Sequence, residues 1–340
     1  MVAAVTRLSS GSSSGPRPIN LRKDIPQVLA LLNVVFRASP DGEGRYTLNR
    51  TSLSQEPWPV LRLRQLRQGM TPGYVWVESG KIVGNVSVLT TDTRGRYLVA
   101  NVAVHPDFRR QGIARTLIET IIERVREQGG HELLLQVRRD NEAAIRLYES
   151  IDFSDLGSMT SWYSSFSHFR LLPAATGAQS PDQVGDYFVR PLRRHEWRAA
   201  YRLDAASIDP DLNWPDPLRV DHYKIDLWRA VGNLISGRQV ESWVAEGPDK
   251  WMAGVATITS EWGRLHTLTL RVHPRCHGEV EQPLLAKLLR RLQHTYRRNI
   301  RIDHPAEDEV TNQLLHRANF TPRRTLTTMR LQTADRTSGR

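Results

Sequence analysis

The chain has 340 residues, of which 39% are hydrophobic and 24% are charged, and its formal net charge at pH 7 is +11. Single domains usually contain about 100–200 residues, so this length predicts two folded domains. No segment reaches the ~18–20 consecutive apolar residues of a membrane-spanning helix, and we expect no membrane segment. The basic charge attracts anions such as nucleic acid, acidic lipid or a phosphorylated cofactor, but an ordinary solvated surface has the same composition.

The first 18 residues are rich in small polar side chains, including an uninterrupted run of serine and glycine at 9–15. Such a segment cannot bury enough surface to offset its ordering entropy, so we expect 1–18 to be a disordered tail. The apolar stretch before Arg7 is too short for the core of a secretory signal. Cys276 is the single cysteine, which rules out an intramolecular disulfide and favours a cytoplasmic location.

The first half of the chain alternates apolar patterns of helical and strand period. The predicted order is a strand over 19–22, helices over 25–36 and 60–68, strands over 74–78, 81–90 and 97–104, a helix over 114–126, a strand over 133–137 and a helix over 141–150. Two of these strands flank Ser79-Gly80, which predicts a hairpin. The pattern therefore predicts an α/β domain.

The same order of elements begins again after a stretch rich in Ala, Gly, Pro and Ser at 171–185, which we interpret as a linker. Val272-His273-Pro274 repeats Val104-His105-Pro106, and Asn319-Phe320 repeats Asp152-Phe153, at a nearly constant offset of about 168 residues. This regularity predicts an internal duplication. We expect domains over 19–170 and 186–332, followed by a tail over 333–340.

Residues 101–117 carry the chemistry of the first half, because they combine a strand, a glycine-containing loop and the start of a helix. Such a junction presents unpaired backbone N–H groups at the positive end of the helix dipole, where a pyrophosphate can bind. Gly112 and Ala114 keep side chains away from the phosphates, and three arginines of the same stretch add positive charge.

This stretch resembles the GCN5-related N-acetyltransferase (GNAT) superfamily, whose cofactor loop reads Arg/Gln-x-x-Gly-x-Gly/Ala. Residues 141–153 also resemble the family's Asn-x-x-Ala-x-x-Leu-Tyr-x-x-x-Gly-Phe segment, with Asp152 in place of the usual glycine. The resemblance covers 19–165 well, but 186–331 mainly by the order of elements.

The resemblance implies two tandem GNAT domains, each a mixed, mostly antiparallel twisted sheet flanked by helices. It also implies that acetyl-CoA is the co-substrate, that no metal takes part, and that the fourth strand separates from its neighbour to receive the pantetheine arm. The implied acetyl-CoA contacts are Val102, Ala103, Val104, Arg109, Arg110, Gln111, Gly112, Ile113, Ala114, Arg115 and Asn141.

In this family the acceptor amine attacks the thioester directly, so the site needs to orient two substrates and to move protons. Tyr148 is the candidate general acid, since a phenol of pKa near 10 can protonate a thiolate whose pKa is about 8.5. A packed helix tyrosine would look the same, and Asn141 could simply cap its helix. The base stays open between Asn101 with an ordered water and Glu78.

The second half retains the core pattern but not the site. Aligned on its own Val272-His273-Pro274, it places Val280 and Gln282 opposite Gly112 and Ala114. Glu279 and Glu281 would then repel phosphate. Leu315 and Asp308 replace the tyrosine and the asparagine. We expect a degenerate domain with a structural or substrate-shaping role.

The sequence thus predicts an N-acetyltransferase that acts on a primary amine of a small molecule or a peptide. The polar loop 39–59 is expected to line the acceptor side. The alternative is a module that senses acyl-CoA, or binds nucleic acid or another partner, without turnover. An intact Tyr148 speaks against that alternative, and we do not expect a nucleic-acid partner. The composition leaves open whether the chain is a monomer or a homodimer.

Overall fold

The structure is a computed structural model that describes residues 14–36, 72–91, 93–173, 178–180, 183–213, 223 and 237–333. The chain forms two compact units. Unit 1 comprises 1–136, 143–154 and 329–340, and unit 2 comprises 137–142 and 155–328. Each unit is therefore assembled from more than one stretch of the chain. No described helix is long and apolar enough to cross a membrane.

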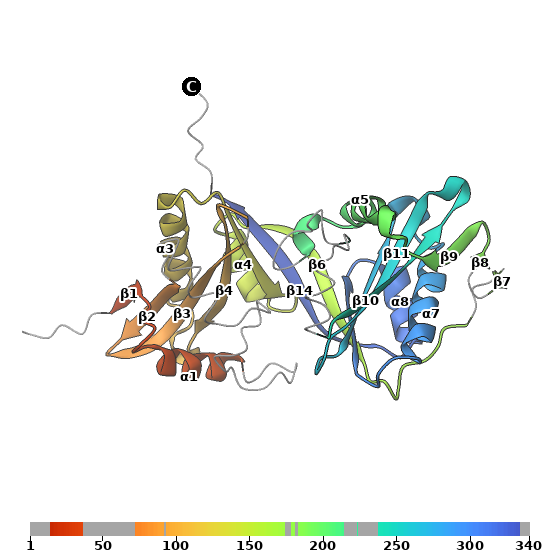
Figure 1. The fold of residues 1–340 in the computed structure, drawn as a ribbon. Coiled ribbons are helices and arrows are strands. Elements are labelled where there is room, and N and C mark those ends of the chain that lie inside the picture. The colour runs from red at the N-terminus through yellow and green to blue at the C-terminus, as the bar shows by residue number, and fades with distance from the viewer. Residues whose placement is uncertain are drawn as a thin grey trace, which may run out of the picture. The chain divides into compact units, whose positions relative to one another are not determined.

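Unit 1 contains a twisted sheet with the strand order β1-β2-β3-β4-β5, and the last residues of β14 follow β5 (Figure 1). From β1 to β5, neighbouring strands are antiparallel, except for the parallel pair of β4 and β5. Its strands are β1 (Gly15–Pro18), β2 (Gly73–Glu78), β3 (Lys81–Thr90), β4 (Arg96–Val104) and β5 (Glu132–Arg138), and its helices are α1 (Ile25–Phe36), η1 (Pro106–Phe108), α3 (Ile113–Glu127) and α4 (Glu142–Glu149).

Helices α1 and α3 cover opposite faces of this sheet. On one face, α1 buries Val28, Leu31 and Leu32 against strand residues that include Val75 and Ala103. On the other face, α3 packs so closely on β3 that a Cβ at Gly84 would lie 2.8 Å from Ile113 and 3.1 Å from Leu117. The glycine thus sets the distance between helix and sheet. This packing fixes where the first turn of α3 begins relative to the end of β4.

Unit 2 has the strand order β14-β6-β13-β12-β11-β10-β9-β8-β7. β12 and β13 are parallel, whereas β6 pairs with β13 in the antiparallel direction. Its strands are β6 (Ser154–Ser164), β7 (Ala178–Ser180), β8 (Gln183–Val184), β9 (Tyr187–Pro191), β10 (Gln239–Glu246), β11 (Met252–Ser260), β12 (His266–Val272), β13 (Ile300–Pro305) and β14 (Thr321–Gln332). Its helices are η2 (Arg194–Glu196), α5 (Trp197–Ser207), η3 (Pro210–Leu212), η4 (Pro248–Lys250), η5 (Pro274–Cys276), α7 (Glu281–Leu292) and α8 (Glu309–Arg317).

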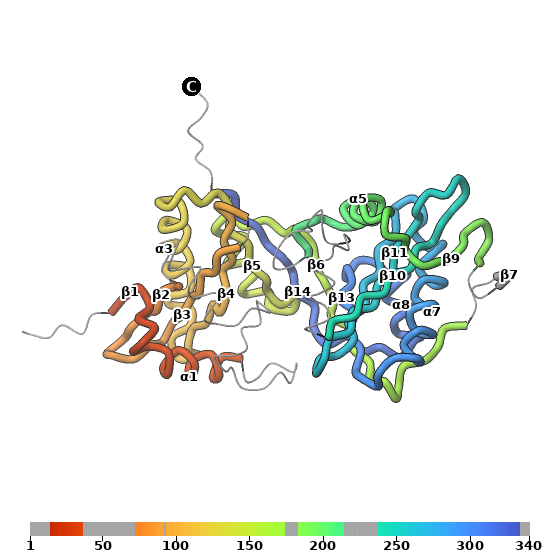
Figure 2. The backbone as a smooth tube through the Cα atoms, viewed as in Figure 1, coloured from red at the N-terminus to blue at the C-terminus, as the bar shows by residue number. Residues whose placement is uncertain are grey.

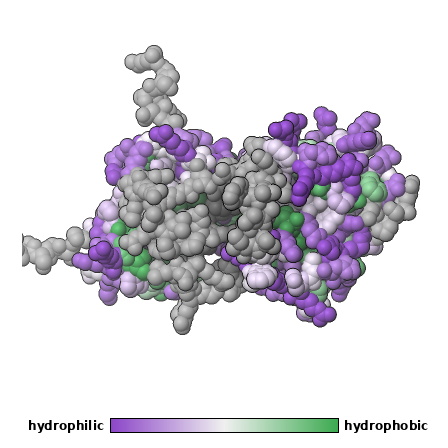
Figure 3. Space-filling model, viewed as in Figure 1, coloured by the Kyte–Doolittle hydropathy of each residue, from purple (hydrophilic) through white to green (hydrophobic). Residues whose placement is uncertain are grey.

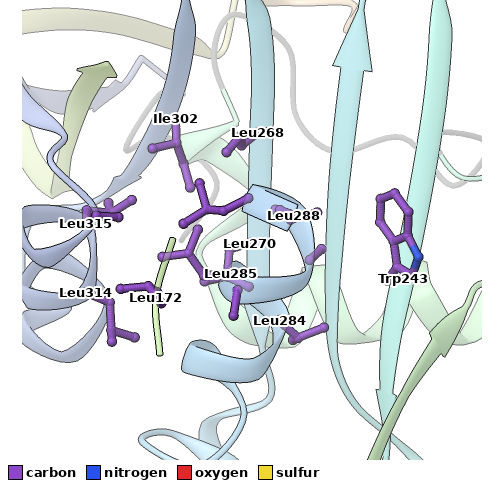
Figure 4. Close-up of a cluster of buried hydrophobic side chains, with 14 of the residues drawn as sticks. Leu172, Trp243, Leu268, Leu270, Leu284, Leu285, Leu288, Ile302, Leu314 and Leu315 are labelled. Carbon is purple, nitrogen blue, oxygen red and sulfur yellow. The ribbon is translucent and has the colours of Figure 1, made fainter. Parts of the chain in front are cut away.

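The main core of unit 2 lies between its sheet and the helices α7 and α8. Leucines of α7 and α8 meet Leu268, Leu270 and Ile302 of the strands (Figure 4). A smaller cluster on the other face joins Leu203 of α5 to Val244 and Val255. The face of unit 2 visible in Figure 3 is mainly hydrophilic over the described residues.

The observed order of elements confirms the predicted fold class of mostly antiparallel sheets flanked by helices, as the tube in Figure 2 traces. Two local predictions differ from the structure, and a third cannot be compared with it. The first strand is Gly15–Pro18, inside the expected tail, and 19–22 is not a strand. The expected linker contains the short strands β7 and β8. The expected helix over 60–68 lies outside the described residues.

The two halves repeat the same packing, but in a register that corrects the sequence alignment of the loop. A Cβ at Gly254 would lie 2.6 Å from Leu284 and 3.2 Å from Val280, as one at Gly84 would meet Leu117 and Ile113. Val280 is fully buried and therefore corresponds to Ile113, not to Gly112. The loop of the second half is one residue shorter than expected. Its acidic residues Glu279 and Glu281 consequently occupy the positions of Gly112 and Ala114.

Candidate active site

The strands β4 and β5 pair only over the first half of their lengths. The ladder between them runs from Arg96–Glu132 to Val99–Leu135 and then stops, although β4 continues to Val104 and β5 to Arg138. From Ala100 onward, the edge of β4 that faces β5 has no ladder pair among the described residues. The backbone N–H and C=O groups along this edge can therefore form hydrogen bonds with an extended ligand, as the resemblance to the GNAT superfamily implies.

A β-bulge interrupts β4 at the same place. Ser87 pairs with Ala100 and Asn85 with Ala103, so that Asn101 and Val102 together oppose Val86. Asn101 has a φ of 50°, a left-handed conformation that asparagine tolerates better than most residues. Its side chain lies 3.4 Å from the Ser87 hydroxyl. The residue type at 101 is therefore explained by the backbone, with or without a role in positioning a water molecule.

The loop between β4 and α3 has the conformation expected of an anion site. Arg110 and Gly112 both have positive φ, of 61° and 79°. Gly112 is the N-cap of α3, and a Cβ built on it would meet no protein atom within 4 Å. Among the described residues, we find no hydrogen-bond partner for the backbone N–H groups of Gly112, Ile113 and Ala114. These groups can bind phosphate oxygens at the positive end of the helix dipole.

The three arginines of the loop region differ in how they are engaged. Arg109 Nε lies 3.3 Å from the Val104 carbonyl oxygen, which ties the loop back to the end of β4. Arg110 is exposed, as is Gln111. Arg115 donates to the Ser150 hydroxyl at 2.5 Å and lies 3.4 Å from Glu119. All three keep positive charge close to the loop, but Arg115 also connects α3 to the end of α4.

Tyr148 lies at the C-terminal end of α4, two residues before Ser150. The hydrogen bond from Arg115 to Ser150 therefore holds this end of α4 close to the first turn of α3. The Tyr148 ring is buried and lies 5.9 Å from Phe153, measured between centroids. No hydrogen bond of its hydroxyl is found among the described residues. Burial raises the pKa of this phenol, so it keeps its proton through the neutral range. Asn141 immediately precedes α4, and its backbone N–H donates a hydrogen bond to the backbone carbonyl oxygen of Arg138.

The other predicted site residues lie elsewhere. Glu78 ends β2 at the hairpin and accepts a hydrogen bond from Ser14. It lies three residues along β2 from Val75, the partner of Asn85, which corresponds to about 10 Å of strand. The structure therefore does not bring Glu78 to the bulge. The predicted acceptor loop 39–59 lies outside the described residues.

In unit 2, the corresponding loop is filled by the protein itself. The Glu281 carboxylate accepts hydrogen bonds from the backbone N–H groups of Gly278, at 2.8 and 2.9 Å, and of Val280, at 3.2 Å. Glu281 is 1% exposed, and this burial raises the pKa of its carboxyl. A side-chain carboxylate thus takes the place that a phosphate would occupy.

Asp308, at the position of Asn141, is also fully engaged. Its carboxylate oxygens accept from the Thr311 backbone and hydroxyl, from His277 and from His304. Burial acts to raise the pKa of Asp308, but the His304 and Thr311 bonds outweigh it and hold that pKa below its usual range. This carboxylate stabilises the start of α8, and it has no capacity left for a ligand. Among the described residues, no group of histidine, cysteine and carboxylate side chains is arranged to hold a metal ion.

Comparisons with known proteins identify a family and several similar proteins. A family model described as the acetyltransferase (GNAT) family matches residues 42–153. The [ribosomal protein bS18]-alanine N-acetyltransferase of Escherichia coli K12 is 43% identical over 63 residues, which are 18% of this chain and 43% of that protein. The chain thus spans less than half the length of that relative.

Two further similarities extend over longer stretches. The N-alpha-acetyltransferase RimI of Mycobacterium tuberculosis is 30% identical over 114 residues, which are 33% of this chain and 70% of that protein. The crystal structure of a GCN5-related N-acetyltransferase from Sphaerobacter thermophilus aligns with a TM-score of 0.58 at 15% identity. That alignment covers 94% of this chain and 96% of the other, so the shared fold includes both halves.

Proposed function

Because the chain belongs to the acetyltransferase (GNAT) family, we propose that it transfers an acetyl group from acetyl-CoA to a primary amine, and that unit 1 carries the reaction. The single observation that carries the proposal is the alignment of three features along one strand. β4 leaves β5, bulges at Asn101 and then leads into the Gly112 loop at the start of α3. An extended acyl thioester with a pyrophosphate at its far end fits this order.

The loop is suited to the pyrophosphate. The open space at Gly112 and the unpaired N–H groups of the first helical turn provide donors, and the exposed Arg109 and Arg110 provide charge. Nearer the bulge, the edge of β4 lacks ladder partners, so its backbone groups can bind the amide groups of the pantetheine arm. The site therefore positions the thioester mainly through backbone groups, which is how orientation lowers the barrier of a two-substrate reaction.

Tyr148 is the residue that we propose to assist the leaving thiolate. As the amine nitrogen bonds to the carbonyl carbon and the C–S bond breaks, negative charge develops on the sulfur. The buried phenol is held protonated, so it can donate a hydrogen bond and then its proton to that sulfur, and the proton that the attacking nitrogen loses as the amide forms restores the phenol. No nucleophile of the protein is needed for this direct transfer.

The acceptor that fits best is the α-amine of a peptide. Among the described residues, no carboxylate contacts the bulge, and Asn101 can at most orient a water molecule. At pH 7.5 roughly a third of α-amines are neutral, since their pKa is about 7.7–8.0, whereas lysine amines of pKa about 10.4 are almost fully charged. A site without a strong base therefore favours an α-amine. The names of both relatives specify acetylation of an alanine or of an α-amine, which supports this choice.

The test is turnover by the full chain with acetyl-CoA and matched amines. The panel contains a peptide with a free N-terminal alanine, the same peptide with a blocked N-terminus and an internal lysine, and an amino sugar. Released CoA is measured with a thiol reagent, and the acetylated product by mass spectrometry. We expect CoA release with the free α-amine. Binding of acetyl-CoA without release on any amine would instead favour the non-catalytic sensing module.

A further inference from the structure

Asn85 is an unusual residue for its position, because it is 0% exposed in the middle of the mostly apolar strand β3. It lies opposite Val75 on β2 and Ala103 on β4, and it therefore shares the face of the sheet that α1 covers. Both cross-strand partners are apolar, although Ser87, two residues along β3 on the same face, is polar. A valine or leucine would pack here without a buried polar group of its own.

The amide of Asn85 is directed at the bulge. Its Nδ2 donates to the carbonyl oxygen of Asn101 at 2.8 Å, whereas its Oδ1 is buried and has no partner among the described residues. A buried amide that is only half paired is unfavourable compared with an apolar side chain. Packing therefore does not explain the asparagine, but its single bond to the bulged residue does.

The second half provides an internal comparison. There, the residue after the helix-contacting glycine Gly254 is Val255, in the place of Asn85. β11 and β12 pair without any shift of register from Gly254–Val272 to Thr259–Thr267, and no residue of β12 has a positive φ. The copy whose phosphate position is filled by Glu281 thus lacks both the bulge and the asparagine.

We propose that Asn85 is a positioning residue that holds the β4 bulge in the shape that receives the thioester, an inference that rests on the proposed acetyl transfer. Because of the bulge, Asn101 and Val102 have no regular pairing with β3, and at this point β4 no longer pairs with β5 either. Their backbone groups can then face the reacting carbonyl. Asn85 satisfies the Asn101 carbonyl that the bulge displaces, and so it fixes the direction of these groups.

The test compares Asn85→Leu with Val75→Ala, which removes buried volume from the same face without touching the bulge. For Asn85→Leu we expect kcat to fall roughly ten- to a hundredfold, and the Kd for acetyl-CoA to rise by a much smaller factor, because the Gly112 loop remains intact. Val75→Ala should lower the thermal stability but leave kcat unchanged in the folded protein. Equal kcat in Asn85→Leu and wild type would overturn the proposal.

Asn85→Asp adds a readout that a purely structural role would not move. A buried carboxyl can donate to the Asn101 carbonyl only when it is protonated, so the kcat of this variant relative to wild type should rise as the pH falls. The ratio for Asn85→Leu should stay constant with pH. If wild type shows no turnover, the proposed function fails. A crystal structure of Asn85→Leu then decides the bracing role by itself, because an unchanged positive φ at Asn101 would refute it.

Discussion

Gly112→Glu is the substitution that most directly tests the assignment of the phosphate loop. The backbone at Gly112 has a φ of 79°, so any other residue costs about 1–2 kcal/mol there. The new side chain would meet no protein atom at its Cβ, which leaves its charge free to occupy the space in front of the loop. A unit charge about 4 Å from a phosphate charge, at an effective dielectric constant of 20, costs about 4 kcal/mol, or roughly a thousandfold in Kd.

Gly129→Glu is the matched control, because Gly129 lies just beyond the opposite end of α3. It has a φ of 69°, and its Cβ would also meet nothing within 4 Å. The backbone strain is therefore the same. A negative charge at the C-terminal end of a helix is also unfavourable, so this variant should be the less stable of the two. Its affinity for acetyl-CoA should nevertheless equal that of wild type.

The assay is calorimetric titration with acetyl-CoA, together with thermal unfolding of each variant. Wild type should bind one acetyl-CoA per chain, since Glu281 already fills the second loop. Gly112→Gln separates the charge from the size of the side chain, and the difference from Gly112→Glu should shrink as salt is added. Retention of wild-type Kd in Gly112→Glu, or an equal loss in Gly129→Glu, would show that the loop does not bind the pyrophosphate.

Three further predictions follow from the same geometry. Tyr148→Phe should lower kcat by roughly 10²-fold while leaving the Kd for acetyl-CoA unchanged, as measured by steady-state kinetics and calorimetry; unchanged turnover would make Tyr148 a packing residue. With a peptide α-amine, kcat/KM should rise with pH to a plateau near the amine's pKa of about 8. The value of kcat/KM should not decline up to pH 10, because burial raises the pKa of Tyr148 above its usual value of about 10, and the phenol keeps its proton over this range. A chain ending at Thr328 should lose the thermal transition of unit 1, since it lacks the buried Met329 and Leu331, each worth up to about 3 kcal/mol. A chain ending at Thr333 should unfold like wild type.

Local signals in the sequence were sufficient for most elements. The helix predicted over 25–36 is α1, and the hairpin predicted around Ser79-Gly80 joins β2 and β3. Asp152 and Asn319, the repeated residues before phenylalanine, both have positive φ, of 67° and 63°. Their equivalence reflects a shared left-handed turn, which explains why the family motif has glycine there. The hydrophobic period of an element and the residues of a turn each lie within a few consecutive positions, so the sequence alone is enough to predict them.

Features that depend on distant partners could not be read in this way. β1 contains two prolines and resembles a tail, but an edge strand tolerates proline because one side needs no ladder bonds. A constant offset between the halves misaligns the loop of the second half by one residue, because the burial of Val280 and Leu284 sets the true register. For Asn85 the sequence does contain a signal, because an asparagine stands in a mostly apolar strand where the second half has Val255.

The retention of a second half with a filled phosphate position has a structural explanation that requires no ligand. Unit 1 includes the end of β14, where Met329 and Leu331 are buried and the backbone N–H of Thr333 donates to the His131 carbonyl. Removing the second half would therefore remove part of the core of unit 1. A chain ending near residue 175 tests folding and cannot test whether unit 2 shapes the acceptor site. That question needs substitutions in unit 2 that leave β14 intact, combined with kcat/KM for the peptide amine.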